Sequence, residues 1–267
     1  MNEVIKKYAV VTGASSGIGW HISKELAKKG YAIVAVSNQA ELLAKLKFEL
    51  EQEYQIQVLT IDIDLTKNDA AQNIFDFCQK ENLTIEVLVN NAGILVYGEV
   101  ISIELERTEN ILHLHMNTPV LLCRLFGEVM VNNQKGYILN VSSISAVMPY
   151  PLISLYGPTK AFLRHFSKAL YIEMKRTNVN VTCLLPGATA TALHDKDKIN
   201  LSLAMKIGVM EKPEFVAKEG VTALFKKKRE CIPGILNKLT VLFLPFLPTF
   251  IIRLIYKSYL RRVKMSS

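Results

Sequence analysis

Short, uniformly apolar runs alternate along the chain with longer stretches in which apolar residues recur at helical spacing. The runs predict strands and the stretches predict helices. Strands are expected at Tyr8–Thr12, Ile33–Val36, Val58–Ile63, Val87–Val89, Tyr137–Val141 and Val179–Leu184. Helices are expected at Ile18–Lys29, Ala40–Glu53, Ala70–Lys80, Ile103–Val131 and Tyr156–Lys175. Strands that are apolar throughout are typical of a parallel sheet covered by helices on both faces.

The alternation contains no linker-like stretch that would divide it into separate domains. The chain has 267 residues and half of them are hydrophobic, which suits one large core. We therefore expect an α/β fold with a doubly wound parallel sheet of the Rossmann type, in a single domain over residues 1–230. Residues 231–267 are apolar and basic, and they are expected to form a C-terminal helical extension.

The positive charge of the chain is confined to its C-terminal part. Residues 1–210 carry 20 basic and 20 acidic side chains, whereas residues 211–267 carry 12 basic and four acidic ones, and the net charge is +8. Residues 250–264 predict an amphipathic helix whose basic stripe holds Arg253, Lys257, Arg261 and Lys264. A helix of this kind can lie on an anionic membrane surface, pack against the fold, close the substrate site or pair subunits.

The location of the protein is expected to be cytoplasmic, with peripheral contact at a membrane surface. No signal-peptide pattern is seen at the N-terminus. The most apolar stretch, Leu239–Ile252, contains Pro245 and Pro248 and is shorter than the roughly 20 residues that cross a bilayer. The cysteines are Cys78, Cys123, Cys183 and Cys231, and their wide spacing predicts neither disulfides nor a metal site.

A glycine-rich segment follows the first predicted strand and opens the first predicted helix. The expected contacts to a cofactor are Gly13, Ser15, Ser16, Gly17, Ile18 and Gly19. Glycines in such a turn let backbone amides approach a pyrophosphate, and the start of the helix favours negative charge. A glycine pattern alone is weak, because tight turns also need glycine, but its place between strand and helix indicates a dinucleotide site.

The end of the second predicted strand bears on the choice of cofactor. An acidic residue there would bind the ribose hydroxyls of NAD, but this chain has Ser37 and Asn38. Neither residue repels a 2′-phosphate, so we favour NADP(H) over NAD(H). The alternative is that these are polar turn residues with no part in selectivity.

A tyrosine and a lysine four residues apart open the last long helix of the alternation. Tyr156 and Lys160 lie on one helical face, and an ammonium near a phenol lowers the pKa of the phenol toward a useful range for acid–base chemistry. Ser143 follows the strand Tyr137–Val141, at the edge of the sheet where ligands bind. Ser143 is therefore a candidate donor to a substrate carbonyl, or else a helix cap.

Taken together, these motifs resemble the short-chain dehydrogenase/reductase family in its single-domain branch. The motifs that carry the resemblance are Thr12–Gly19, Asp64, Asn90–Gly93, Asn117, Ser143, Tyr156, Lys160 and Pro186–Thr191. Their order along the chain matches the family as well as their identity does.

The resemblance implies a role for each residue. Tyr156 would be the acid in reduction and the base in oxidation, Lys160 would bind the nicotinamide ribose, and Ser143 would orient the carbonyl. Asn117 would hold a water that links Lys160 to solvent, unless it is only a helical asparagine. The remaining cofactor contacts implied are Asp64, Leu65, Asn91, Ala92, Gly93, Pro186, Gly187, Thr189 and Thr191. Asp64 can also serve only as a turn former.

The substrate and partners follow less directly. The segment 192–215 is rich in apolar residues and is expected to form a lid over a hydrophobic carbonyl compound or alcohol, of acyl, lipid-like or steroid-like kind. The resemblance also implies a homodimer or homotetramer. The alternative function is a non-catalytic nucleotide-binding regulator on the same fold. A nucleic-acid partner is not expected, because no reading element accompanies the basic tail.

Overall fold

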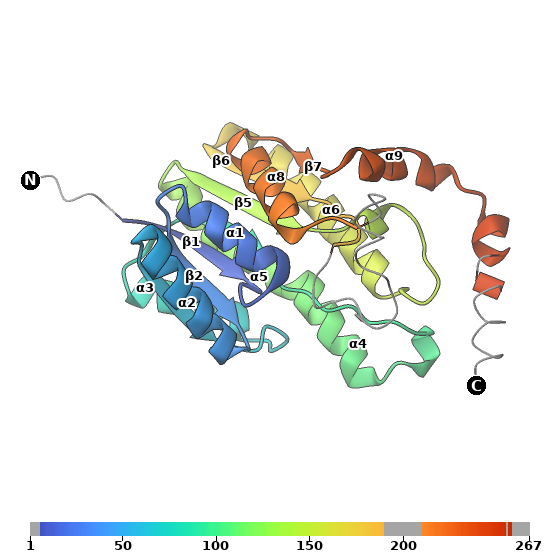
Figure 1. Cartoon of the computed structure of the whole chain (residues 1–267), viewed down its shortest axis with the longest axis horizontal. Coiled ribbons are helices and arrows are strands. Elements are labelled where there is room, and N and C mark those ends of the chain that lie inside the picture. The colour runs from blue at the N-terminus through green and yellow to red at the C-terminus, as the bar shows by residue number, and fades with distance from the viewer. Residues whose placement is uncertain (1–5, 190–209, 255, 258–267) are drawn as a thin grey trace, which may run out of the picture.

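The protein is built around a seven-stranded parallel sheet with the order β3-β2-β1-β4-β5-β6-β7 (Figure 1). The computed structural model describes residues 6–189, 210–254 and 256–257. The strands are β1 (Lys7–Thr12), β2 (Ala32–Ser37), β3 (Val58–Asp62), β4 (Thr84–Asn90), β5 (Gly136–Val141), β6 (Val179–Leu184) and β7 (Glu230–Cys231). The chain leaves β1 toward β2 and β3 and then returns to add β4 to β7 on the other side, so the topology switches between β1 and β4.

Helices cover both faces of this sheet, as the uniformly apolar strands predict. They are α1 (Gly17–Ala27), α2 (Ala40–Tyr54), α3 (Ala70–Lys80), α4 (Leu105–Leu112), α5 (Thr118–Asn132), α6 (Tyr156–Glu173), α8 (Pro213–Phe225) and α9 (Ile235–Phe243). Shorter helical turns are η1 (Val100–Ser102), η2 (His113–Asn117), η3 (Ile144–Val147), η4 (Met174–Arg176) and η5 (Leu244–Phe246). The prediction of a doubly wound Rossmann-type sheet is confirmed.

The core consists of two apolar layers, one on each face of the sheet. Alternate residues of each strand enter opposite layers: Val11 packs with α1, α2 and α8, whereas Val10 packs with α3, α5 and α6. Both valines are fully buried. This period of two explains why strands that face helices on both sides show no polar alternation in the sequence.

The long helix expected over Ile103–Val131 is interrupted. Residues His113–Asn117 form η2, a π-helical turn, between α4 and α5. A π turn accommodates an extra residue in a helix and often lies at a functional site. Apolar periodicity cannot reveal it, because the apolar pattern continues on both sides of the turn.

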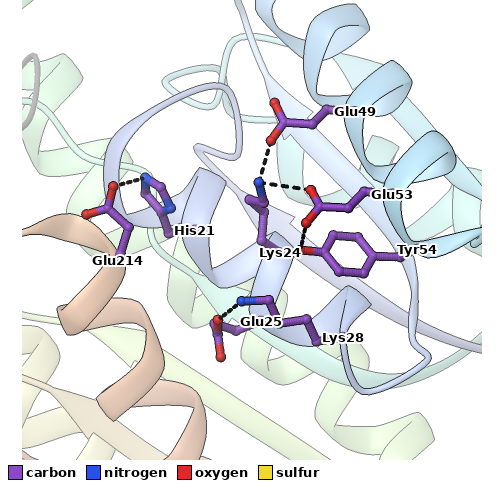
Figure 2. A network of polar contacts seen from close by, with 8 residues as sticks. All are labelled: His21, Lys24, Glu25, Lys28, Glu49, Glu53, Tyr54 and Glu214. Carbon is purple, nitrogen blue, oxygen red and sulfur yellow. Dashed lines mark hydrogen bonds and ion pairs between the residues drawn. The ribbon is translucent and has the colours of Figure 1, made fainter.

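A network of polar contacts joins the helices on one face of the sheet, and Figure 2 shows its members. The Lys24 ammonium of α1 lies 2.5 Å from Glu49 and 3.1 Å from Glu53, both on α2. His21 of α1 lies 3.3 Å from Glu214 of α8. The network clamps α2 and α8 to α1, the helix that opens at the glycine-rich loop.

The C-terminal extension leaves the body of the protein at β7, which belongs to the sheet and spans the boundary expected at residue 230. Helix α9 and the helical turns after it run away from the sheet (Figure 1). Residues 250–254 and 256–257 of the expected amphipathic helix are helical, and residues 258–264 lie outside the described part of the chain. In the described residues, no helix has both the length and the apolar character needed to cross a membrane.

Candidate active site

A pocket of about 390 Å³ opens at the carboxyl ends of the strands, where the topology switches. Open α/β sheets bind their ligands at this position. Its walls include the glycine-rich loop, the ends of β2 and β4, the turn after β5 and the first turn of α6. The charged side chains among its lining residues, within the described part of the chain, are Asp64 and Lys160.

Two glycines of the first loop are required by close backbone contacts. Gly13 has φ +63°, and a Cβ there would lie 2.8 Å from Cα of Ala92. A Cβ on Gly19 would lie 2.1 Å from the carbonyl oxygen of Gly13. The loop therefore folds back on itself and against the end of β4, and its residues Gly13 and Gly17 line the pocket.

The end of β4 is tied to the glycine-rich loop by Thr12 and Asn91. The Thr12 hydroxyl accepts hydrogen bonds from the amides of Asn91 and Ala92, at 2.9 and 3.1 Å. The Asn91 side chain donates to the carbonyls of Thr12 and Gly13. The two sides of the cofactor pocket are thus held together across the switch point.

The end of β2 presents neutral polar groups to the pocket. Ser37 donates to Ser15 at 2.9 Å, and Ser15 donates to Gln39 at 2.7 Å. Asn38 is exposed beside them and also lines the pocket. This corner therefore offers hydroxyl and amide groups and, among its described lining residues, no carboxylate from β2.

Ser143, Tyr156 and Lys160 lie together on the opposite wall. The Lys160 ammonium donates to the carbonyl of Val141 at 3.0 Å and lies 5.8 Å from the centroid of the Tyr156 ring. Ser142 fixes this wall, because its hydroxyl donates to the carbonyl of Lys160 at 2.7 Å. Ser143 also caps η3, since its hydroxyl accepts from the amide of Ser145. The sequence left the cap and the active-site role as alternatives, and the geometry allows both.

Burial shifts the pKa values of Tyr156 and Lys160 in opposite directions. Burial raises the pKa of Tyr156, and a hydrogen bond from Ser143 opposes the rise. Burial also lowers the pKa of Lys160 to about 8. The expected lowering of the Tyr156 pKa by Lys160 is not seen in this arrangement, because the ammonium faces the Val141 carbonyl.

Comparison with known proteins identifies the family. The short chain dehydrogenase family matches residues 7–201, well over half of the chain. The chain belongs to this family. It is 36% identical to human 17-beta-hydroxysteroid dehydrogenase type 3 over 190 residues, which cover 70% of this chain and 60% of that protein. It is 35% identical over 193 residues to the very-long-chain 3-oxoacyl-CoA reductase of Rattus norvegicus, with 70% and 61% covered.

Solved structures of short-chain dehydrogenases share the same architecture. A short-chain dehydrogenase from Sphingobium yanoikuyae in complex with NADPH superposes with a TM-score of 0.78 at 25% identity, over 86% of this chain and 88% of that one. The chain spans about three-fifths of the length of the curated relatives described above.

The structure places most of the predicted family residues around the same pocket. Those that line it are Gly13, Ser15, Ser16, Gly17, Ile18, Ser37, Asn38, Asp64, Leu65, Asn91, Ala92, Gly93, Ser143, Tyr156, Lys160, Pro186, Gly187 and Thr189. Gly19 packs against the carbonyl of Gly13 within the same loop. Asp64 accepts from the amide and hydroxyl of Thr66, so it forms a turn as well as lining the pocket.

Two predicted residues are not among those that the structure places at the pocket. Asn117 lies in the π turn, is exposed and is not among the residues that line the pocket, so its role in a water relay stays a prediction. Thr191 lies outside the described residues, as do residues 192–209 of the expected lid.

Several residues that build this short-chain dehydrogenase site were not among the predicted catalytic residues or cofactor contacts. They are Thr12, Gln39, Ile63, Thr66, Ile94, Leu114, His115, Ser142 and Thr159. Thr12, Gln39, Ile94 and Ser142 are direct neighbours of selected residues, so adjacency was the signal available. His115 had no such signal, because it lies in an apolar helical stretch.

Proposed function

We propose that this protein is an NADP(H)-dependent oxidoreductase that interconverts a carbonyl and an alcohol on a hydrophobic substrate. The observation that carries the proposal is that Ser143, Tyr156 and Lys160 share one pocket with the glycine-rich loop. The residues fit a dinucleotide, because the glycine-rich loop lines the pocket at the start of α1, where its backbone amides and the helix N-terminus can hold phosphates.

The chemistry divides between the cofactor and the side chains. The nicotinamide, when bound, supplies the hydride for the carbonyl carbon. In reduction, the Tyr156 hydroxyl donates its proton to the carbonyl oxygen, and the Ser143 hydroxyl donates a hydrogen bond to the same oxygen as negative charge develops there. Lys160 would hold the nicotinamide ribose, and the hydrogen bond from Ser143 opposes the rise in the Tyr156 pKa caused by burial. In oxidation, Tyr156 accepts the proton.

The preference for NADP(H) is supported by the end of β2. The side-chain amides of Asn38 and Gln39 offer neutral donors to a 2′-phosphate, and these residues place no negative charge against it. The hydroxyl protons of Ser37 and Ser15 are used within the corner, where Ser37 donates to Ser15 and Ser15 to Gln39. The structural relative from Sphingobium yanoikuyae is described in complex with NADPH, which agrees with this choice.

A hydrophobic substrate is supported by the names of the relatives, which refer to a hydroxysteroid and to a very-long-chain 3-oxoacyl-CoA. The steroid nucleus and the very long acyl chain are both large and apolar, although the acyl chain is joined to the charged coenzyme A. A homodimer or homotetramer is supported by exposed apolar side chains on η1, α4 and α5. They are Val100, Ile101, Leu105, Leu112 and Leu121.

We also propose that the extension 231–267 binds an anionic membrane surface. Helix α9 buries a polar residue and exposes its apolar ones, which is the reverse of an ordinary surface helix. Its one buried residue is Asn237, while its leucines and Phe243 are exposed. The exposed set continues past the helix and comprises Ile235, Leu236, Leu239, Leu242, Phe243, Phe246, Phe250 and Leu254.

Charge and position favour a membrane as the occupant of this apolar face. After Cys231 the sequence has six basic residues and no acidic one, which matches an anionic lipid surface. Asn237 packs against Gly187 of the pocket wall, since a Cβ on that glycine would lie 2.3 Å from the asparagine oxygen. The apolar face therefore begins beside the pocket, where an apolar substrate would arrive from the bilayer.

The test is turnover of NADPH with a 17-ketosteroid and with a long-chain 3-oxoacyl-CoA, by wild type and by Tyr156→Phe. We expect wild-type turnover with one of these classes and a loss of about 10²–10⁴ in kcat for the variant, at unchanged NADPH affinity. NADPH binding without turnover of either substrate would instead favour a nucleotide-binding regulator.

A further inference from the structure

A buried histidine beside the active site has no part in the proposed chemistry. His115 lies in the π turn η2, and only 1% of it is exposed. Its ring packs edge-on against the ring of Tyr156, with centroids 5.6 Å apart and planes at 75°. A Cβ on Gly93 would lie 3.0 Å from Nε2 of His115 and 3.4 Å from Nζ of Lys160. The imidazole therefore occupies the space between the cofactor loop and the catalytic wall.

Both nitrogens of the ring have partners, and the partners define its tautomer. Nε2 lies 3.1 Å from the amide nitrogen of Ile94, which can only donate, so Nε2 accepts. The other nitrogen, Nδ1, must then carry the proton, and it lies 2.9 Å from the Thr159 hydroxyl. That hydroxyl donates in turn to the carbonyl of Tyr156 at 2.8 Å. The chain of donors and acceptors is complete when the imidazole is neutral.

Electrostatics keep the ring in this neutral state. Burial lowers the pKa of His115 well below its usual value, and the nearby Lys160 ammonium lowers it further. The titratable groups that face the ring are Lys160 and Tyr156. A proton on Nε2 would also oppose the Ile94 amide, so protonation would break the link to the cofactor loop.

The link runs from one functional segment to another. Ile94 follows Asn91-Ala92-Gly93 at the end of β4 and lines the cofactor pocket. Thr159 and Tyr156 form the first turn of α6, which carries the proton-transferring group of the proposed function. His115 connects these segments through hydrogen bonds from both sides of one rigid ring.

We propose that His115, as the neutral Nδ1-protonated tautomer, is a positioning residue that fixes Tyr156 relative to the cofactor loop. This proposal rests on the proposed function. It adds a residue that contacts neither the substrate nor the cofactor. Its loss misplaces the Tyr156 hydroxyl, so it lowers the rate of the chemical step more than the binding of the cofactor. Misplacement of a reacting group by about 1 Å can cost on the order of 100-fold in rate.

The first measurement concerns the tautomer itself. Two-bond ¹H–¹⁵N correlation spectra of the protein labelled at histidine, without cofactor, report the state of each ring nitrogen. We expect a neutral Nδ1–H signal for His115, assigned with His115→Phe, that persists down to about pH 5, where an ordinary histidine is charged. A charged ring or an Nε2–H tautomer at neutral pH would overturn the proposal.

The second measurement is kinetic and uses matched variants. His115→Phe keeps an aromatic ring against Tyr156 but loses both hydrogen bonds of the imidazole. Thr159→Val keeps the shape of threonine but removes the hydroxyl that bonds to His115. We expect each to lower kcat at least tenfold and to change the KM for NADPH less than threefold. Thr159→Ser restores the hydroxyl and should keep kcat within threefold of wild type. The double variant His115→Phe/Thr159→Val should have a kcat only slightly lower than that of either single variant, because both substitutions break the same series of hydrogen bonds.

The control is His113→Phe, on the same π turn, whose side chain meets Thr118 instead of the pocket. Its kcat should stay within twofold of wild type, and melting temperatures should not follow the kcat losses. If the wild-type protein catalyses turnover and the variants His115→Phe and Thr159→Val retain the wild-type kcat, the positioning role of His115 is contradicted and the proposed function is not. If wild type neither turns over nor binds NADPH, the proposed function fails.

Discussion

The side chain at position 38 tests how the cofactor is chosen. Asn38 is exposed at the end of β2 and lines the pocket beside Ser37 and Gln39. Asn38→Asp places a negative charge where a 2′-phosphate is expected, and it also gives the ribose hydroxyls of NAD an acceptor. We expect at least tenfold weaker NADPH binding and tighter NADH binding, measured by cofactor fluorescence.

The matched variant at this position is Asn38→Arg, which offers the phosphate a fork of donors and should tighten NADPH binding instead. Equal affinities in all three proteins would mean that position 38 does not contact the cofactor. The preference for NADP(H) would then need another source among the polar groups of the pocket.

A second residue-scale prediction concerns Lys160 and the stability of the fold. Burial lowers the pKa of this ammonium to about 8, so the folded state is penalised wherever the lysine is charged. A shift of this size corresponds to about 3 kcal/mol at neutral pH. Lys160→Met removes the charge but keeps the length, so it should raise the melting temperature while it abolishes turnover.

The pH dependence of this effect has a definite sign. Between about pH 8 and the unfolded pKa near 10.5, the unfolded chain binds a proton that the folded chain has lost, so wild-type stability rises with pH. The advantage of Lys160→Met in urea unfolding should therefore be full below pH 8 and shrink above it. An advantage that stays constant up to pH 10.5 would contradict the lowered pKa.

The sequence could predict the residues that act through their own chemistry. Ser143, Tyr156 and Lys160 were found because their types and spacing are unusual together, and the structure brings them to one wall. His115 could not be found in this way, because its significance depends on Ile94 and Thr159, which are 21 and 44 residues away. The direction of the Tyr156 pKa shift also depends on burial and on where the Lys160 side chain turns.

At the scale of elements, the loop between β1 and α1 allows a comparison of two glycines. Gly19→Ala places a Cβ 2.1 Å from the Gly13 carbonyl, a backbone atom that cannot move without moving the loop. Gly30→Ala meets nothing within 4 Å and is strained only by its φ of +80°. We expect Gly19→Ala to cost about 2 kcal/mol in urea unfolding and Gly30→Ala about 1 kcal/mol.

The two variants should also differ in function. Gly19→Ala should weaken NADPH binding at least tenfold, because the loop that faces the pocket must shift, whereas Gly30→Ala should bind as wild type. Normal NADPH binding by Gly19→Ala would indicate that this loop does not hold the cofactor.

Helices and strands were predictable from the sequence where a single spacing of apolar residues holds over the whole element. Strands β1, β2, β4, β5 and β6 were found because nearly all of their residues are buried and most are apolar, whereas β3 is a half-exposed edge strand in which only Val58 is buried. Helix α6 was found with Pro158 in its first turn, where proline is tolerated. The π turn at His113–Asn117 and the two-residue strand β7 were not predicted. A turn that inserts one residue, and a strand set by its pairing with β6, leave no periodic trace in the sequence.

At the scale of the whole molecule, the sequence located the positive charge but not the exposed apolar face. It predicted a basic amphipathic helix over residues 250–264, and the apolar stretch before it was noted only as too short to cross a membrane. The structure adds that α9 turns its apolar residues outward, with Phe243 64% and Leu242 59% exposed. An outward apolar face of this extent marks an interaction site, because isolated soluble proteins rarely expose one.

The decisive measurement for this face is sedimentation with vesicles of phosphatidylcholine containing a quarter phosphatidylserine, at low salt. We expect wild type to sediment with them, and the double variant Leu242→Glu/Phe246→Glu to lose at least four-fifths of the bound fraction. Phe48→Glu serves as the control, because Phe48 lies on α2 and is similarly exposed, at 69%. Vesicles of phosphatidylcholine alone, or high salt, should also weaken binding, since both remove the attraction to the basic tail. Light scattering distinguishes the competing occupant: if the double variant converts a dimer to a monomer and wild type stays in the supernatant, the face belongs to a second copy of the chain and not to lipid.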